Sequence, residues 1–334
     1  MQDRLVFIIG PPRSGSTLLQ RMLGSHAEIH THAEPHIITP LAHLGYFANV
    51  DKAPYDHINS AEAIREFIQD LPAGEEDYVD ACRAYTDVLY GRMLEKSGKK
   101  IFLDKTPAYA LVLPFLARLY PRARYLVLTR HPLAVLSSYA NSFFEGDYQA
   151  AVSFNDILGR YVPAMADFIR QAKVPLYQVR YEDLVSEPEK ILSELFSFLG
   201  LPDQPDAVEY GKHEHEDKSY GDPKVRHSSR PTTGSLTTWA DELASDEQKL
   251  EIARRITAPL AAEDITTWGF DKDSLFNPVS ESNGERPESS RKWRLDSYRL
   301  RRKVFLRLRR NIHRNRLGKT LRRVRYYCDV LLRE

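Results

Sequence analysis

The residues from Gly10 to Thr17 have types and spacing that suit a bound phosphate. The run GPPRSGST follows an apolar segment and precedes a helical pattern, so backbone N–H groups and a helix N-terminus would face one point. The spacing is close to the nucleotide loop G-x-x-x-x-G-K-[ST], but Ser16 occupies the lysine position. Arg13 offers a cation inside the loop. The pattern indicates an anion site, and a tight turn without chemistry is the alternative.

An arginine ends a second apolar run. In RYLVLTRHPLAVLSSY, Arg130 closes the run and a helix is expected to begin near Pro132. Ser138 follows about two turns along that helix. The carboxyl ends of parallel strands form the edge where α/β proteins bind ligands. Arg130 and Ser138 are therefore predicted to hold a second phosphate, although Arg130 alone could be a surface ion pair.

A parallel sheet would position these residues. Strands are predicted at residues 4–9, 100–103, 124–129 and 175–180. Helices are predicted between and after them, at residues 15–23, 61–70, 77–96, 109–120, 133–142, 154–171, 188–199 and 246–256. Apolar strands that alternate with longer helices indicate βαβ units. The expected fold class is α/β, a P-loop-type three-layer fold with a central, mostly parallel sheet and a basic helical extension.

The charge of the chain is unevenly distributed. Residues 286–334 carry 18 Lys and Arg against 4 Asp and Glu, while the whole chain has a net charge of only +1. We expect a domain over residues 1–275, a linker over 276–290 and a basic amphipathic helical tail over 291–334. The tail could be a solvated extension, or it could lie on an anionic membrane surface. Nucleic-acid binding is not expected, because aromatic residues suited to base stacking are few there.

The remaining polar residues give no sign of a metal or disulfide framework. Two histidine groups, His30-His32-His36 and His213-His215, do not have a recognised zinc spacing. The two cysteines suit a reducing compartment. No signal peptide and no run of about 20 apolar residues is present. A cytoplasmic protein, peripheral at the inner membrane surface through its tail, is the expectation.

Taken together, PPRSGSTLLQRML and LTRHPLAVLSSY resemble the two nucleotide signatures of sulfotransferases that use 3′-phosphoadenosine 5′-phosphosulfate (PAPS). The resemblance covers about residues 4–270. It implies that Arg130 and Ser138 bind the 3′-phosphate of the donor. It also implies that the 5′-phosphate is held by five consecutive residues, Arg13, Ser14, Gly15, Ser16 and Thr17.

Within that family the chain most resembles the tyrosylprotein-sulfotransferase-like branch and its bacterial relatives. The match places a catalytic glutamate at Glu34 in GSHAEIHTHAEP and a catalytic lysine at Lys105 in IFLDKTPAY. The segment VRYEDL places Tyr181 near the donor. In the late loop over residues 211–235, Ser219 and Arg230 are the residues expected to touch the donor.

The resemblance implies transfer of a sulfuryl group from PAPS to a hydroxyl group, without a metal. Glu34 would take the acceptor proton, while Arg13 and Lys105 would stabilise the developing charge. An alcohol, a sugar, a lipid and a phenol all remain open as acceptors, because residues 35–64 and 143–154 read as loops without a motif. Two alternatives are a P-loop kinase that uses ATP and a non-catalytic nucleotide-binding module that docks to membranes through its tail.

Overall fold

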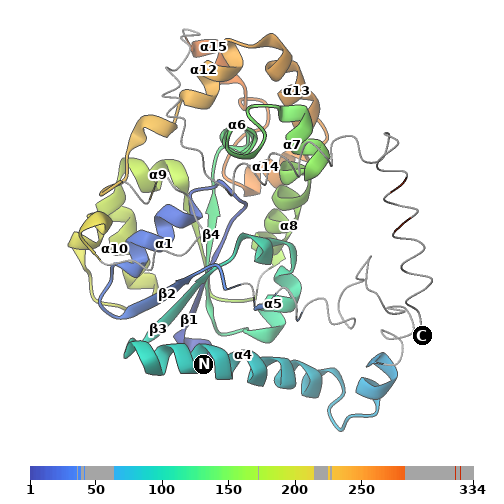
Figure 1. Ribbon diagram of the computed structural model, residues 1–334, viewed down its shortest axis with the longest axis vertical. Coiled ribbons are helices and arrows are strands. Elements are labelled where there is room, and N and C mark those ends of the chain that lie inside the picture. The colour runs from blue at the N-terminus through green and yellow to red at the C-terminus, as the bar shows by residue number, and fades with distance from the viewer. Residues whose placement is uncertain are drawn as a thin grey trace. The chain divides into compact units, whose positions relative to one another are not determined.

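A five-stranded parallel sheet forms the centre of the molecule (Figure 1). The computed structural model describes residues 1–35, 37–38, 41, 64–171, 173–213, 225, 228–282, 320 and 324. The strand order is β2-β3-β1-β4-β5, and each neighbouring pair is parallel. The strands are β1 (Leu5–Ile9), β2 (Ile29–Ala33), β3 (Ile101–Lys105), β4 (Arg124–Thr129) and β5 (Leu176–Arg180). The predicted α/β fold class is confirmed.

The helices connect the strands and then continue beyond β5. In chain order they are α1 (Ser16–Gly24), α4 (Glu75–Ser97), α5 (Leu113–Leu119), α6 (Pro132–Phe143), α7 (Tyr148–Phe154), α8 (Ile157–Gln171), α9 (Tyr181–Ser186), α10 (Pro188–Phe198), α12 (Thr238–Ala244), α13 (Glu247–Thr257), α14 (Ala262–Thr267) and α15 (Asn277–Glu281). Short 3₁₀ helices lie at Gln2–Arg4, Pro107–Leu111 (η2), Pro205–Val208, Tyr210–Lys212 and Thr233–Ser235 (η5). All of these strands and helices belong to one compact unit.

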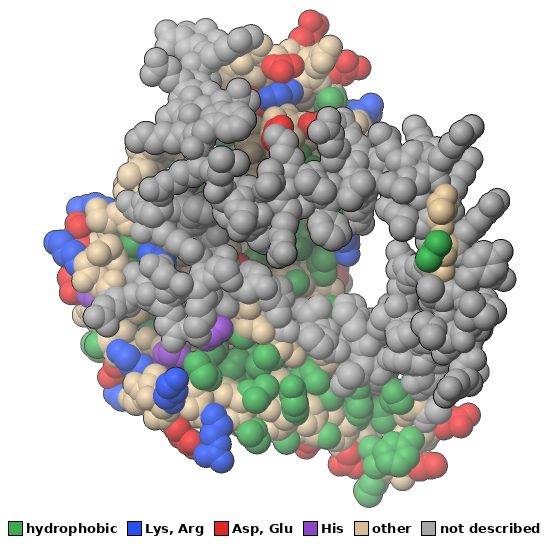
Figure 2. Space-filling view, in the orientation of Figure 1, with side chains coloured by type: hydrophobic (Ala, Val, Ile, Leu, Met, Phe, Trp, Pro, Cys, Tyr) green, Lys and Arg blue, Asp and Glu red, His purple; other side chains and the backbone are tan. Residues whose placement is uncertain are grey.

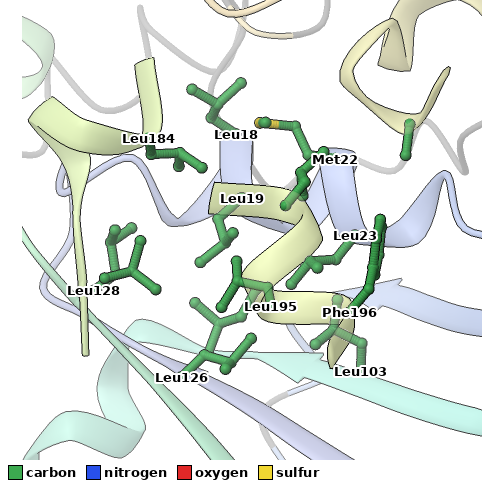
Figure 3. Packing of buried hydrophobic residues seen from close by; sticks show 14 of the residues in the cluster. Leu18, Leu19, Met22, Leu23, Leu103, Leu126, Leu128, Leu184, Leu195 and Phe196 are labelled. Atoms are coloured by element: carbon green, nitrogen blue, oxygen red, sulfur yellow. The ribbon is translucent and has the colours of Figure 1, made fainter. Parts of the chain in front are cut away.

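Helices cover both faces of the sheet. Side chains alternate along a strand, so β1 directs Val6 and Ile8 to one face and Phe7 to the other. On the first face, leucines of the strands pack against α1, α9 and α10 (Figure 3). On the second face, the ring of Phe7 contacts Tyr109, Tyr120 and Tyr125, at centroid distances of 6.4, 5.8 and 5.5 Å. The sheet is thus enclosed, as its nearly continuous apolar strands predict.

Four of the strands were predicted from their sequences, but β2 was not. Its sequence, IHTHA, contains two histidines and one threonine, which do not read as an apolar run. The strand forms because it pairs with β3 from Ile29↔Ile101 to Ala33↔Lys105. It lies at an edge of the sheet, where only one side needs a partner strand.

The predicted and observed helices differ in several places. The single helix expected over residues 109–120 is two elements, η2 and α5, because Pro114 lies in the first turn of α5. Helix α7 occupies a segment read as a loop, and the Asp147 side chain caps it by accepting from the N–H of Ala150 at 2.8 Å. The first residues of the predicted linker form α15, whose Val279 is buried, so a linker can begin only after it.

The basic tail and most of the late loop fall outside the described residues. The predicted helical tail at 291–334 is described only at Thr320 and Val324, and Ser219 is not described. Among the described residues, no helix has the length and apolar content needed to cross a bilayer.

Helix α4 carries apolar side chains on two sides. Its buried side holds Val79, Tyr90 and Leu94. Tyr85 and Val88 are respectively 55% and 60% exposed. Hydrophobic side chains gather over this helix along the lower edge of the view in Figure 2. Sequence periodicity could therefore predict this helix but not which of its sides faces the sheet.

Candidate active site

The glycine loop lies between β1 and α1 and has a conformation that requires glycine. Gly15 has a φ of 100°, and a Cβ atom there would lie 2.3 Å from the ring of Tyr181. Arg13 also has a positive φ, of 75°, which is uncommon for a residue with a side chain. Tyr181, at the start of α9, is buried and lies against the loop. The loop and the first residue of α9 are thus in direct contact.

The loop has the features expected of an anion site. Ser14 is fully buried, and its hydroxyl oxygen has no hydrogen-bond partner in the described part of the chain. Helix α1 begins at Ser16 and continues through Thr17, so the backbone N–H groups of its first turn point toward the loop. A buried hydroxyl without a partner is costly unless a ligand or water completes it. The residues present therefore fit a phosphate group.

Arg130 joins the glycine loop to the late loop. Its Nη1 donates to the carbonyl oxygen of Arg13 at 3.0 Å, and its Nη2 donates to that of Ser235 at 3.1 Å. Its guanidinium carbon lies 4.2 Å from the centre of the Tyr181 ring, a cation–π contact. The Nε1 of Trp268 donates to the Arg130 carbonyl oxygen at 2.8 Å, which fixes the backbone of this residue.

The structure brings the two predicted phosphate sites together. The Nε of Arg13, in the first site, donates to the Oγ of Ser138, in the second, at 3.1 Å. Ser138 lies on α6, which begins at Pro132 directly after β4. Because β1 and β4 are neighbouring strands, the glycine loop and Arg130 emerge from the same edge of the sheet.

Glu34 and Lys105 form an ion pair at that same edge. Lys105 ends β3 and is 1% exposed, while Glu34 directly follows β2 and is 17% exposed. The pair forms because Ala33 and Lys105 are partners in the β2–β3 register. Burial lowers the pKa of Lys105, and the neighbouring Glu34 and Asp104 carboxylates oppose that shift. Lys105 also lies opposite Ile8 of β1, so the pair is beside the glycine loop.

Asp104, the residue before Lys105, is enclosed by hydroxyl groups. Its oxygens accept from Tyr90 at 2.6 Å, Thr106 at 2.9 Å and Tyr109 at 3.2 Å. Burial raises the pKa of Asp104 to about 6, although these hydrogen bonds oppose the shift. An acidic residue in this position binds Mg²⁺ in nucleotide kinases, but Asp104 is fully buried and already has three donors. No group of three or more candidate metal ligands occurs among the described residues.

In the late loop, Ser235 is the described residue that contacts the predicted donor site. Its Oγ lies 2.7 Å from the Tyr181 hydroxyl, and its carbonyl accepts from Arg130. Arg230 is paired with Glu189 and Glu209 and is 49% exposed. The sequence contained Ser235 within TTGSLTTW, but spacing alone did not separate it from the other serines of this segment.

His131 is held neutral beside the site. Its ring stacks on Trp239 at a centroid distance of 4.2 Å and meets the edge of Phe270. The pKa of His131 is lowered to about 3, mainly by burial and further by the positive charges of Arg130 and Arg180. Its backbone N–H donates to Glu182 at 2.9 Å, so the turn after β4 is attached to the residue after Tyr181.

Stability should fall at low pH because of His131. Its folded pKa lies below the ordinary value of 6.5, so below pH 6.5 the unfolded chain binds a proton that the folded chain does not. Between pH 7.5 and 5.0 the free energy of unfolding should fall by about 2 kcal/mol more for the wild type than for His131→Asn. Urea denaturation at both pH values measures this difference. Equal losses in the two proteins would contradict it.

One end of the parallel sheet carries a glycine loop without the kinase lysine, the hydrogen bonds of Arg13 and Arg130, and a carboxylate–lysine pair. This is the arrangement of a protein of the nucleotide-loop class. The chain belongs to the sulfotransferase family, whose family model matches residues 6–205. This confirms the family that the two sequence signatures indicated.

Relatives of known name agree with this assignment. The chain is 28% identical to nodulation protein NoeE of Sinorhizobium fredii, over 80% of this chain and 66% of NoeE. It is 26% identical to protein-tyrosine sulfotransferase 1 of Danio rerio, over 59% of this chain and 53% of that protein. The chain thus spans about two thirds or less of these two relatives. A solved sulfotransferase domain, from the Synechococcus PCC 7002 olefin synthase, shares the fold with a TM-score of 0.51 and 22% identity, over 79% of this chain and 93% of that domain.

Proposed function

We propose that the protein transfers a sulfuryl group from PAPS to a hydroxyl group, giving a sulfate ester and adenosine 3′,5′-bisphosphate. The observation that carries this proposal is the hydrogen bond between Arg13 and Ser138, which joins the two predicted anion sites, with the Glu34–Lys105 ion pair beside them. A donor with phosphate groups at both the 3′ and 5′ positions suits two such sites. Family membership supports the same reaction.

Each residue has a task in this reaction. The backbone from Ser14 to Thr17 would bind the 5′-phosphate, and Arg130 with Ser138 would bind the 3′-phosphate, beside Tyr181. Glu34 would take the proton of the acceptor hydroxyl as the acceptor oxygen forms its bond to sulfur. The bond between sulfur and the bridging oxygen breaks at the same time, and Arg13 and Lys105 would stabilise the charge that builds there.

In this proposal fixed cations do the work that a metal ion does in kinases. Lys105 is suited to it because its ammonium group is held in the interior, where an electrostatic contact is stronger than in water. Ser235 would complete the donor site through Tyr181 and Arg130. Ser219 and Arg230 stay as weaker candidates, and Arg230 would have to leave Glu189 and Glu209 to reach the donor.

The acceptor is proposed as an alcohol, a sugar, a lipid or a phenol. A relative named protein-tyrosine sulfotransferase supports the phenol class, since tyrosine is a phenol. We place the reaction in the cytoplasm, with peripheral contact to the inner membrane surface through the basic residues of 291–334 and without nucleic acid. The excess of Lys and Arg in this segment supports contact with anionic lipids.

Titration calorimetry with two nucleotides tests the proposal. Adenosine 3′,5′-bisphosphate, the product nucleotide, should bind without added metal, and ATP should bind at least about tenfold more weakly because the lysine of the kinase loop is replaced by Ser16. Magnesium-dependent ATP binding with none for the bisphosphate would instead support the kinase alternative. Deletion of residues 283–334 tests the other alternative, a non-catalytic nucleotide-binding module that docks to membranes. Such a module would lose all function with its tail, whereas a transferase would keep its activity.

A further inference from the structure

The hydroxyl of Tyr109 connects two segments that the proposed chemistry depends on. Tyr109 lies in η2 and is fully buried. Its hydroxyl donates to the Asp104 carboxylate at 3.2 Å and accepts from the backbone N–H of Ile38 at 3.2 Å. Asp104 is the neighbour of Lys105, and Ile38 lies four residues after Glu34. One phenol thus bridges the segments that carry the two partners of the ion pair.

The backbone of Glu34 is strained, so the chain must be anchored both before and after this residue. Its φ is 36°, in the left-handed region that residues with a side chain seldom adopt. Such a conformation costs about 1–3 kcal/mol and persists only when the surrounding structure holds it. Before Glu34, the chain is held by the β2–β3 pairing and by Gln20, whose Nε2 donates to the His32 carbonyl at 3.0 Å. After Glu34, the Ile38 N–H bound to Tyr109 provides the corresponding backbone anchor.

The Tyr109 hydroxyl is suited to both contacts. Burial and the nearby Asp104 carboxylate raise its pKa well above the ordinary value, so the phenol keeps its proton and donates to Asp104. Its oxygen is then free to accept from Ile38. Asp104 has two further donors, Tyr90 and Thr106, and neither makes a hydrogen bond to the described residues that directly follow Glu34. Only the Tyr109 hydroxyl reaches from this carboxylate to the Ile38 backbone in the described residues.

We propose that Tyr109 is a positioning residue for the catalytic base. Through its hydrogen bonds to Asp104 and to the Ile38 backbone, it holds the Glu34 carboxylate in register with Lys105 and the transferring group. The proposal rests on the proposed function, because it assigns Tyr109 a task in that reaction. A misplacement of about 1 Å can cost roughly a hundredfold in rate, so the loss of one anchor should be measurable.

The test compares two phenylalanine variants of the full chain. Tyr109→Phe removes the bond to Asp104 and the anchor of Ile38, while the matched control Tyr90→Phe removes only a bond to the same Asp104 oxygen. With PAPS as donor and 4-nitrophenol as the probe acceptor, Tyr109→Phe should lower kcat by about 10- to 100-fold and leave the KM for PAPS within about twofold. Tyr90→Phe should stay within about threefold. Equal losses of kcat in the two variants would overturn the proposal.

A double-variant cycle shows whether Tyr109 acts through Glu34. In the Glu34→Gln background the base is already absent, so adding Tyr109→Phe should change kcat by less than about threefold. If the two substitutions multiply in full, Tyr109 acts by another route and the assignment is wrong.

Hydrogen exchange tests the anchor independently of transferase activity. Peptides covering residues 33–41 should exchange at least about tenfold faster in Tyr109→Phe, and at the wild-type rate in Tyr90→Phe. Unchanged exchange in Tyr109→Phe would refute the anchor, whatever the enzyme does. Faster exchange in a protein that binds no bisphosphate and transfers no sulfuryl group would uphold the anchor and refute the proposed function instead.

Discussion

Glu34→Gln is expected to slow sulfuryl transfer by about 10²- to 10⁴-fold while donor binding stays near the wild-type strength. The amide keeps the shape of the carboxylate but cannot take the acceptor proton. Lys105, which is almost fully buried, also loses the only carboxylate paired with it in the described residues. The rate is measured with PAPS and a hydroxyl acceptor found by screening with ³⁵S-labelled donor. Binding is measured by calorimetry with adenosine 3′,5′-bisphosphate.

A matched control for this variant is available in the same strand pair. Glu28 is also paired with a lysine, Lys100, but these two residues directly precede β2 and β3, at the end of the strands opposite Glu34 and Lys105. Glu28→Gln should therefore change turnover by less than about twofold, as expected for a surface ion pair. If Glu34→Gln were as active as Glu28→Gln, Glu34 could not be the base.

Arg130→Ala is expected to weaken adenosine 3′,5′-bisphosphate by about 10- to 100-fold and adenosine 5′-phosphate by much less. Hydrogen bonds between charged groups contribute about 1.5–3 kcal/mol, which corresponds to this range of affinity. The selectivity follows because Arg130 is assigned to the 3′-phosphate, which adenosine 5′-phosphate lacks. Calorimetry with the two nucleotides measures both affinities.

Arg124→Ala serves as the control for Arg130→Ala. Arg124 begins the same strand, β4, and donates to the Asp3 carbonyl at 3.1 Å, at the edge of the sheet opposite the site. Its removal should leave both affinities unchanged. Arg130 also supports the loops of Arg13 and Ser235, so a loss of affinity shared equally by the two nucleotides would indicate a disturbed loop rather than a lost phosphate contact.

The sequence was sufficient to predict those parts of the candidate site that lie within one strand–loop–helix unit. The glycine loop with Arg13, and Arg130 with Ser138, each occupy a short segment whose apolar run and helix start are visible in the residues. The parallel sheet then places the ends of such runs at one edge, so their proximity follows from the fold class. The Arg13–Ser138 hydrogen bond agrees with this expectation.

The parts that depend on distant segments could not be read from local patterns. Strand β2 is polar in sequence and owes its existence to pairing with β3. The Glu34–Lys105 pair rests on that pairing, and only the family resemblance brought these two residues together in advance. Ser235 was missed because an aperiodic loop gives no register. Its position follows from the packing of η5 on α9 and from its contact with Arg130.

The strand order of the sheet has a consequence for how this protein folds. Residue 6 of β1 pairs with residue 124 of β4, and residue 29 of β2 pairs with residue 101 of β3, so the sheet has no local hairpin. Long chain segments must close before any strand gains a partner, and their entropy is lost before the contacts are made. Folding should therefore be slow compared with that of a helical bundle. A nascent chain that ends before residue 101 holds both Glu34 and the glycine loop, but it has neither β3 nor β4 to pair with β1 and so cannot assemble the site.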